Sequence, residues 1–219
     1  MKKPTGKNGI TRVSINPEGD SEISFIVNEY PEGKDDIEDS IVNVFISSAN
    51  NDLSKHGDVF LLSNPRKNEL DDFDFTVDGP NGDAYLELME ATELKGVKGG
   101  YQNAPKQYRV INFVDFIYEK LKCKSDKYPK NLSKDLFLLI YTTHFSFSLS
   151  ESAVVYLRWL LRENPLLFSA IFLFNPIDQE YGEVRWLFPV PPELLEGFSP
   201  ELIKDSVVHS LAPDGFEVI

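Results

Sequence analysis

The stretch DDFDFTVDGPNGDAYLELMEATELK (residues 71–95) predicts two antiparallel strands around a turn. Apolar and polar residues alternate on both sides of DGPNGD (78–83), which is rich in turn-forming residues. If Val77 faces Ala84 across this turn, side-chain alternation places a wholly apolar set on one face of the hairpin. That set is Phe73, Phe75, Val77, Ala84, Leu86 and Leu88.

The opposite face of this predicted hairpin carries acids. In the same register Asp74 and Glu87 are direct cross-strand neighbours, with Cβ atoms about 5 Å apart. Like charges so placed are destabilising unless the site is wet, one acid is protonated or a cation lies between them. Mg²⁺ suits such a pair, because it binds one or two protein carboxylates and completes its shell with water and phosphate oxygens. A solvated sheet face whose acids move apart is the alternative.

Hydrophobic periodicity predicts the remaining elements. They are a hairpin at 10–30, helices at 35–52, 106–122 and 150–164, and strands at 58–63, 135–143, 167–174 and 183–190. Ser150 is predicted to cap the third helix. This order predicts an α/β (α+β) fold, a mixed central β-sheet flanked by helices, in a single domain over 1–219. A C-terminal tail (191–219) of short helical turns is expected to pack on it.

The charge of the chain is unevenly distributed. Its net charge of −13 argues against a polyanionic partner, because nucleic-acid binding relies on Lys and Arg. The segment 95–134, however, holds ten basic and three acidic residues, a net charge of +7. This basic segment is a candidate contact for nucleic acid. A solvated helix face with a lysine-rich loop is the alternative.

The composition favours a cytoplasmic protein. One cysteine, Cys123, excludes an intramolecular disulfide, and three histidines leave few ligands for a structural zinc site. The start MKKPTGKNGITR lacks the apolar stretch of a signal peptide. The apolar runs LFLLIY (136–141) and LLFSAIFLF (166–174) are too short to span a bilayer, so no membrane contact is expected. The oligomeric state cannot be read from the sequence.

The acidic pair and the element order resemble the PD-(D/E)xK nuclease superfamily, which has the restriction-endonuclease-like fold. The resemblance covers a nuclease-like core at about 35–143. It implies that Asp74 matches the family's Asp and Glu87 the acid of its (D/E)xK element, both as metal ligands and catalytic residues. Glu38, on the preceding helix, matches an additional metal-associated acid seen in some branches. The implied cofactor is Mg²⁺.

Two positions depart from the family pattern. Phe73 stands where the family has proline, and Met89 stands where it has lysine. The second departure matters chemically, because a thioether supplies neither positive charge nor a proton near the scissile phosphate. Replacement lysines are available in or just after the loop that follows the second strand of the hairpin. They are Lys95, Lys98 and Lys106, the last at the start of the next predicted helix.

The resemblance implies metal-assisted phosphodiester hydrolysis, in an active or a degenerate form. The frame ELK (93–95) also spells ExK but lies at the frayed end of the strand, and it ranks second. A different class of function is a non-catalytic interaction protein that binds a protein partner through its acidic surface. Met89 and the net charge favour that alternative. A small-molecule enzyme with another pocket is a third.

Overall fold

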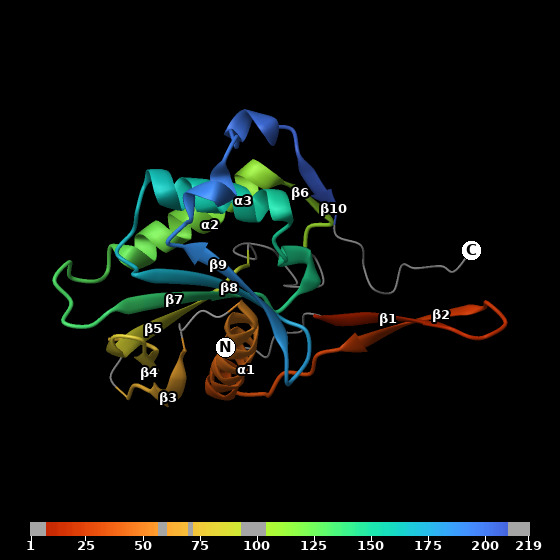
Figure 1. The fold of residues 1–219 in the computed structure, drawn as a ribbon, viewed down its shortest axis with the longest axis horizontal. Coiled ribbons are helices and arrows are strands. Elements are labelled where there is room, and N and C mark those ends of the chain that lie inside the picture. The colour runs from red at the N-terminus through yellow and green to blue at the C-terminus, as the bar shows by residue number, and fades with distance from the viewer. Residues whose placement is uncertain (1–7, 57–60, 70–71, 93–103, 210–219) are drawn as a thin grey trace.

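The centre of the molecule is a six-stranded mixed sheet with strand order β3-β4-β5-β7-β8-β9 (Figure 1). The computed structural model describes residues 8–56, 61–69, 72–92 and 104–209. The strands are β3 (Ser63–Lys67), β4 (Phe75–Gly79), β5 (Gly82–Glu90), β7 (Leu136–Tyr141), β8 (Ala170–Pro176) and β9 (Gly182–Phe188). The pairs β5–β7 and β7–β8 are parallel and the others antiparallel. The predicted mixed sheet is confirmed.

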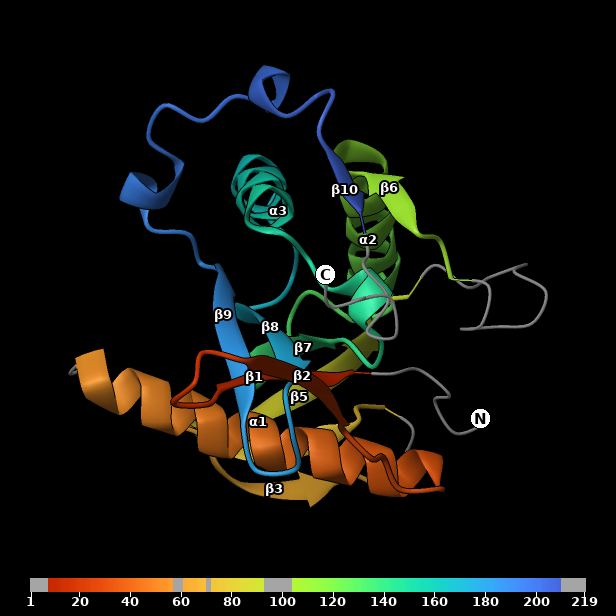
Figure 2. The same ribbon diagram turned by 90° about the vertical axis from the view of Figure 1, so that its right-hand side faces the viewer.

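Helices cover both faces of this sheet. Helix α1 (Lys34–His56) lies on one face, and α2 (Val110–Ser125) and α3 (Glu151–Glu163) lie on the other (Figure 2). The last two share a face because β5, β7 and β8 follow one another across the sheet, and right-handed crossovers then put both connecting helices on the same side. Ser150 caps α3 by accepting a hydrogen bond from the backbone N–H of Ala153 (3.3 Å), as predicted. None of the helices in the described ranges is long and apolar enough to cross a membrane.

The hairpin of β4 and β5 has the predicted register. Val77 pairs with Ala84 and Phe75 with Leu86 around the turn. The apolar face of the hairpin is buried against α1 from Phe75 onward, and Val77 and Leu86 are fully inaccessible to solvent. Phe73, predicted on this face, instead packs on the α2 side against Tyr85, because it precedes the first residue of β4 and is outside the strand's alternation. From α1 to β7 the chain forms a helix, three strands of the central sheet, one short strand outside that sheet, a helix and a strand.

The core has two layers because helices cover both faces of the sheet. Along β7, Phe137, Leu139 and Tyr141 pack on the α1 side. The alternating residues Leu136, Leu138 and Ile140 pack on the side of α2 and α3. Every residue of β7 is buried, as the continuous apolar run predicts for a strand covered on both faces.

The strand predicted at 58–63 is displaced along the chain. Residues 57–60 lie outside the described part, and the observed strand is β3, which contains Pro65. An edge strand tolerates proline, and the register of β3 against β4 shifts between Ser63 and Arg66. Leu62 is instead tied to α1, because the Asn50 side chain bonds both its backbone N–H (3.1 Å) and its carbonyl oxygen (2.7 Å).

The helix predicted at 106–122 begins and ends later than expected. Residues Gln107–Arg109 form a short strand, β6, that pairs with β10 (Val207–His209) near the end of the described chain. Helix α2 then runs three residues further than predicted, to Ser125. Before β10 the tail forms short 3₁₀ turns at Pro192–Leu195 and Pro200–Leu202 and passes over α3 (Figure 2).

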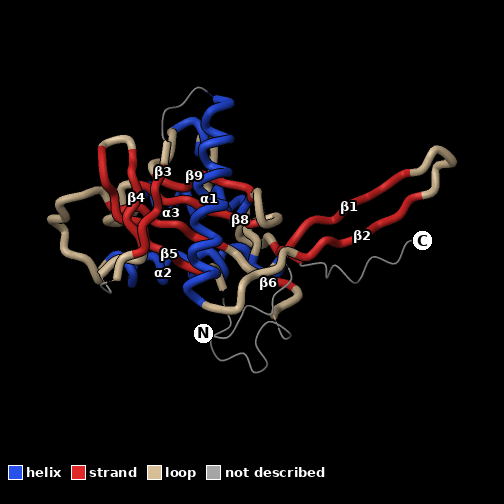
Figure 3. Tube along the Cα trace, turned by 90° about the horizontal axis from the view of Figure 1, so that it is seen from below, coloured by secondary structure: helices blue, strands red, loops and turns tan. Residues whose placement is uncertain are grey.

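The first hairpin projects from the body of the molecule. Strands β1 (Gly9–Ile15) and β2 (Ser21–Val27) form a separate two-stranded ribbon (Figure 3). Its base is held by the Asn8 side chain, which donates to Asn175 Oδ1 (3.1 Å) and to the Pro176 carbonyl oxygen (2.7 Å).

Candidate functional site

Asp74 and Glu87 meet across neighbouring strands, as the register predicts. Asp74 directly precedes β4, and Glu87 lies in the middle of β5. The backbone N–H of Asp74 donates to Glu87 Oε1 (3.2 Å), and the backbone N–H of Leu88 donates to Asp74 Oδ2 (2.7 Å). Each carboxylate is therefore fixed by the backbone of the opposite strand.

A lysine that no motif singled out completes this pair. Lys124, in the last turn of α2, forms an ion pair with Glu87 Oε2, and its ammonium lies 3.8 Å from Asp74 Oδ2. The Glu87 side chain is only 3% exposed, whereas those of Asp74 and Lys124 are 31% and 20% exposed. One cation therefore contacts a buried and a partly open carboxylate at the same time.

The electrostatic environment of Glu87 reflects its burial. Burial raises the pKa of Glu87, the hydrogen bond and charge of Lys124 lower it, and the charge of Asp74 raises it again. Tyr128 also forms a side-chain hydrogen bond with Glu87. Burial, together with the bond to Glu87, raises the pKa of Tyr128, so its hydroxyl stays neutral and donates to the carboxylate.

Three stacked aromatic rings form one wall of the site. The rings of Phe73 and Tyr85 stack with centroids 3.9 Å apart, and those of Phe73 and Tyr128 with centroids 5.1 Å apart. Phe73 occupies the position at which the resembling family has proline. It orients Tyr128, whose hydroxyl then reaches Glu87.

These groups open into a hollow of about 550 Å³. We call it the carboxylate hollow; it is lined by Asp72, Phe73, Asp74, Glu87, Lys124, Lys127, Tyr128, Pro129 and Leu132. This volume is in the range of small-ligand sites.

Glu38 does not join Asp74 and Glu87. It lies on α1, on the opposite face of the sheet from α2, and its carboxylate pairs with Lys34 (3.2 Å) and lies 3.8 Å from Lys67. The resemblance placed it with the metal ligands. Its ion-pair partners are Lys34 and Lys67, so the described structure does not bring Glu38 to Asp74 and Glu87.

The predicted replacement lysines are not brought to the pair in the described structure. Lys95 and Lys98, like the frame 93–95, lie outside the described residues. Lys106 is exposed and precedes β6, next to the start of α2, whereas the carboxylates lie at the other end of that helix. Met89 packs against the core on the α2 side.

One feature of the sequence indicates that Lys124 has an anionic partner: its place on the apolar face of α2. Ile117 and Leu121 are fully buried, and Lys124 follows them at the spacing of one helical face. A lysine on such a face needs an anionic partner, which here is Glu87.

Four lysines of the basic segment line hollows around the end of α2, whereas Lys120 and Lys134 have other partners. Lys120 donates instead to the Thr92 carbonyl oxygen (2.7 Å), and Lys134 pairs with Asp83 (3.1 Å). The lysines that line hollows at this end are Lys122, Lys124, Lys127 and Lys130.

The donor set of the carboxylate hollow fits a hard divalent cation. The described residues contain no cluster of three acidic, histidine or cysteine side chains, so an ion here would have two protein carboxylates and complete its shell with other oxygens. Asp74 Oδ1 is available, because no hydrogen bond or ion pair engages it among the residues that the structure describes. Mg²⁺ tolerates this arrangement, since it usually keeps several water ligands.

The raised pKa of Glu87 predicts a pH-dependent stability. The folded protein holds this proton to higher pH than the unfolded chain does, so the folded state binds more protons in that interval. The free energy of unfolding should therefore fall as pH rises from the ordinary glutamate range through the raised pKa. Urea unfolding of the wild type and of Glu87→Gln, from about pH 4 to about pH 8, measures this effect. A difference between the two proteins that does not change with pH would contradict it.

Comparisons with known proteins give no family. No family model matches the chain, and no curated protein matches it. Among solved structures, the chain is similar to Pyrococcus furiosus SfsA, determined in complex with Ca²⁺, with 14% identity and a TM-score of 0.29. The similarity covers 80% of this chain and 74% of that one. Because the TM-score is below 0.5, this likeness supports no conclusion about the activity or ligands of this chain.

Proposed function

We propose that this chain is a metal-dependent phosphodiesterase of the PD-(D/E)xK type, in which Lys124 replaces the lysine missing at Met89. The observation that carries the proposal is the ammonium of Lys124, which contacts the carboxylates of both Asp74 and Glu87. The carboxylate hollow gives these groups access to a ligand.

Each residue has a role that follows from its contacts. Asp74 and Glu87 hold the metal, which when bound polarises the phosphate and lowers the pKa of water. Lys124 reaches past the carboxylates with a positive charge for the phosphate oxygens. Tyr128 keeps Glu87 in place by donating to it. The reciprocal backbone bonds hold both acids still, so little reorganisation is needed when substrate binds.

A polynucleotide is the substrate class that the surroundings favour. Lys127 lines the carboxylate hollow, and Lys122 and Lys130 line the neighbouring one. These three lysines neutralise the charges of successive phosphates along a bound strand, although the whole chain has a net charge of −13.

Metal binding by matched variants tests the proposal. Titration calorimetry with Mg²⁺ or Mn²⁺ should give saturable binding to the wild type and a loss of about tenfold or more in affinity for Asp74→Ala, because one of two protein ligands is removed. Asp72→Ala is the matched control, since Asp72 is exposed and lines the same hollow. Equal affinities of Asp74→Ala and the wild type would overturn the metal site. A nicking assay on plasmid, and cleavage of labelled oligonucleotides, then measure hydrolysis.

A non-catalytic interaction protein is the second candidate. It is favoured by the ion pair itself, because Lys124 already neutralises the carboxylates that a metal would otherwise bring together. On this hypothesis the acidic surface binds a protein partner, and the wild type binds no Mg²⁺ while Lys124→Met gains binding. The same calorimetry therefore separates the two candidates.

A further inference from the structure

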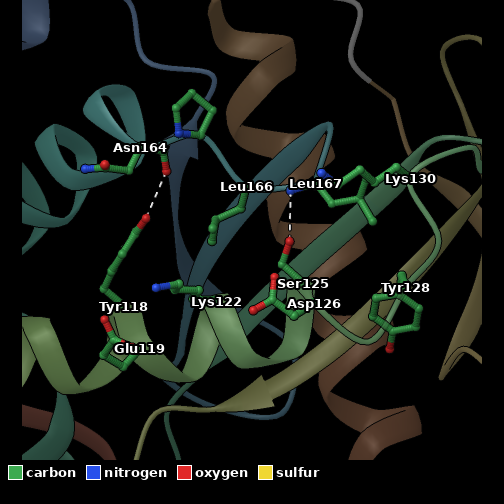
Figure 4. A pocket seen from close by; sticks show the side chains of 11 residues that line it. Tyr118, Glu119, Lys122, Ser125, Asp126, Tyr128, Lys130, Asn164, Leu166 and Leu167 are labelled. Carbon is green, nitrogen blue, oxygen red and sulfur yellow. Dashed lines mark hydrogen bonds between the residues drawn. The ribbon is translucent and has the colours of Figure 1, made fainter.

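A second hollow adjoins the carboxylate hollow at the end of α2. Its volume is about 740 Å³, and we call it the loop pocket (Figure 4). One wall is the last turns of α2 and the loop after it, and the other is the α3–β8 loop. The lining residues are Tyr118, Glu119, Lys122, Ser125, Asp126, Tyr128, Lys130, Asn164, Pro165, Leu166 and Leu167.

Two hydrogen bonds fix the walls of the loop pocket relative to each other. The Tyr118 hydroxyl donates to the Asn164 carbonyl oxygen (2.9 Å), and the backbone N–H of Leu167 donates to Ser125 Oγ (3.0 Å). Figure 4 shows both bonds spanning the gap between α2 and the α3–β8 loop. The pocket therefore exists before any ligand arrives.

Tyr128 lines both hollows. Its ring borders the loop pocket and its hydroxyl points away from it (Figure 4). In the carboxylate hollow that hydroxyl is a hydrogen-bond partner of Glu87. A ligand that occupies the loop pocket therefore lies one side chain away from the proposed reacting phosphate. Two hollows that share one wall in this way suit adjacent units of one polymer.

The lining of the loop pocket suits a nucleoside better than a bare phosphate. The formal charges in its lining sum to zero, since Lys122 and Lys130 are balanced by Glu119 and Asp126. The Pro165–Leu167 segment supplies an apolar surface on which a base can lie. The two acids are acceptors for exocyclic amino groups, and the two lysines are donors for the next phosphate.

A further hollow borders the carboxylate hollow at Asp72 and Phe73, neither of which lines the loop pocket. It has a volume of about 360 Å³, shares Asp72 and Phe73 with the carboxylate hollow, and is also lined by Glu69. Among the described residues that line it there is no lysine or arginine, so Glu69 and Asp72 face any strand that extends this way. Phosphates are therefore disfavoured on that side and favoured on the side of the loop pocket.

We infer that the loop pocket binds the nucleoside next to the scissile phosphate, and that the substrate is a single-stranded nucleic acid. The inference rests on the proposed function for the identity of the scissile phosphate. A base in a duplex is paired and stacked on both sides, and it enters a walled pocket only after it is flipped out. In a single strand the base is unpaired, so binding does not include the free-energy cost of flipping it out of a duplex.

Oligonucleotide binding in EDTA tests the loop pocket without the metal. Fluorescence anisotropy of a labelled single strand, of DNA and of RNA, should give saturable binding to the wild type and weaker binding of the matching duplex. Leu166→Asp should weaken single-strand binding about tenfold, because it places a charge on the apolar surface. Lys122→Ala should weaken it less and reduce the salt dependence by about one unit of slope. Lys204→Ala, an exposed lysine on the tail, is the control and should bind as the wild type does.

The outcomes separate this inference from the proposed function. Binding in EDTA that is lost in Leu166→Asp, without any metal-dependent cleavage, supports the loop pocket and overturns hydrolysis. Cleavage with an unchanged KM in both Leu166→Asp and Lys122→Ala overturns the loop pocket and leaves hydrolysis in place. Absent single-strand binding, or equal binding of the duplex, also overturns the inference. Thermal melting checks that Leu166→Asp is folded, and the exposed Lys122→Ala keeps the test valid if it is not.

Discussion

Replacement of Lys124 by methionine is expected to lower the rate of phosphodiester cleavage by about 100- to 1000-fold. The ammonium of Lys124 is the cation that contacts both carboxylates, and methionine keeps much of its length without its charge. Since Lys124 also lowers the pKa of Glu87, residual activity should require a higher pH than that of the wild type. Initial rates on a labelled oligonucleotide with Mg²⁺, measured across pH, give both quantities.

A rescue variant makes this experiment specific. Met89 lies two residues after Glu87 on β5, so both side chains are on the α2 side of the sheet. Met89→Lys in the Lys124→Met background restores the (D/E)xK spacing, and it should recover part of the lost rate. Lys204→Met is the control for removing an exposed lysine. Wild-type rates in Lys124→Met would exclude Lys124 from the reaction.

Phe172→Ala is expected to reduce the free energy of unfolding by about 3–5 kcal/mol. Phe172 is 1% exposed and lies on the α1 side of the sheet, where its ring centroid is 5.3 Å from that of Phe45 and 5.0 Å from that of Trp186. Its removal leaves a cavity that rigid neighbours fill only in part. Urea or guanidinium unfolding, followed by tryptophan fluorescence, measures the change.

The same substitution should leave Mg²⁺ affinity unchanged under native conditions. Phe172 belongs to the core layer on the side of the sheet away from Lys124. Leu202→Ala, at a 70% exposed position, is the stability control and should change the free energy of unfolding by less than about 0.5 kcal/mol. A comparable loss in Leu202→Ala would show that the effect of Phe172→Ala does not come from its burial.

The sequence predicts the hairpin and its acids well because the determinants are local. The turn 78–83 and strict alternation define one register, in which Asp74 and Glu87 must be neighbours. The continuous apolar run of β7 likewise needs no distant information, since only a strand covered on both faces has that pattern.

The remaining features depend on contacts between distant segments. Nothing within Gln107–Arg109 indicates that it pairs with Val207–His209, so these residues read as the start of a helix. Leu62 looks like part of a strand until Asn50 is known to bond its backbone. From the sequence, Lys124 is only one of the basic residues of 95–134, because the helix pattern alone does not locate its anionic partners, Asp74 and Glu87.

The pairing of β6 with β10 ties the far end of the chain to the catalytic lysine proposed here. The backbone N–H of Val110, the first residue of α2, donates to the Ser206 carbonyl oxygen (3.0 Å), so the tail anchors this helix at its start. Lys124 lies in the last turn of the same helix. Segments that never touch the carboxylates thus help to fix the helix that carries the ammonium to them.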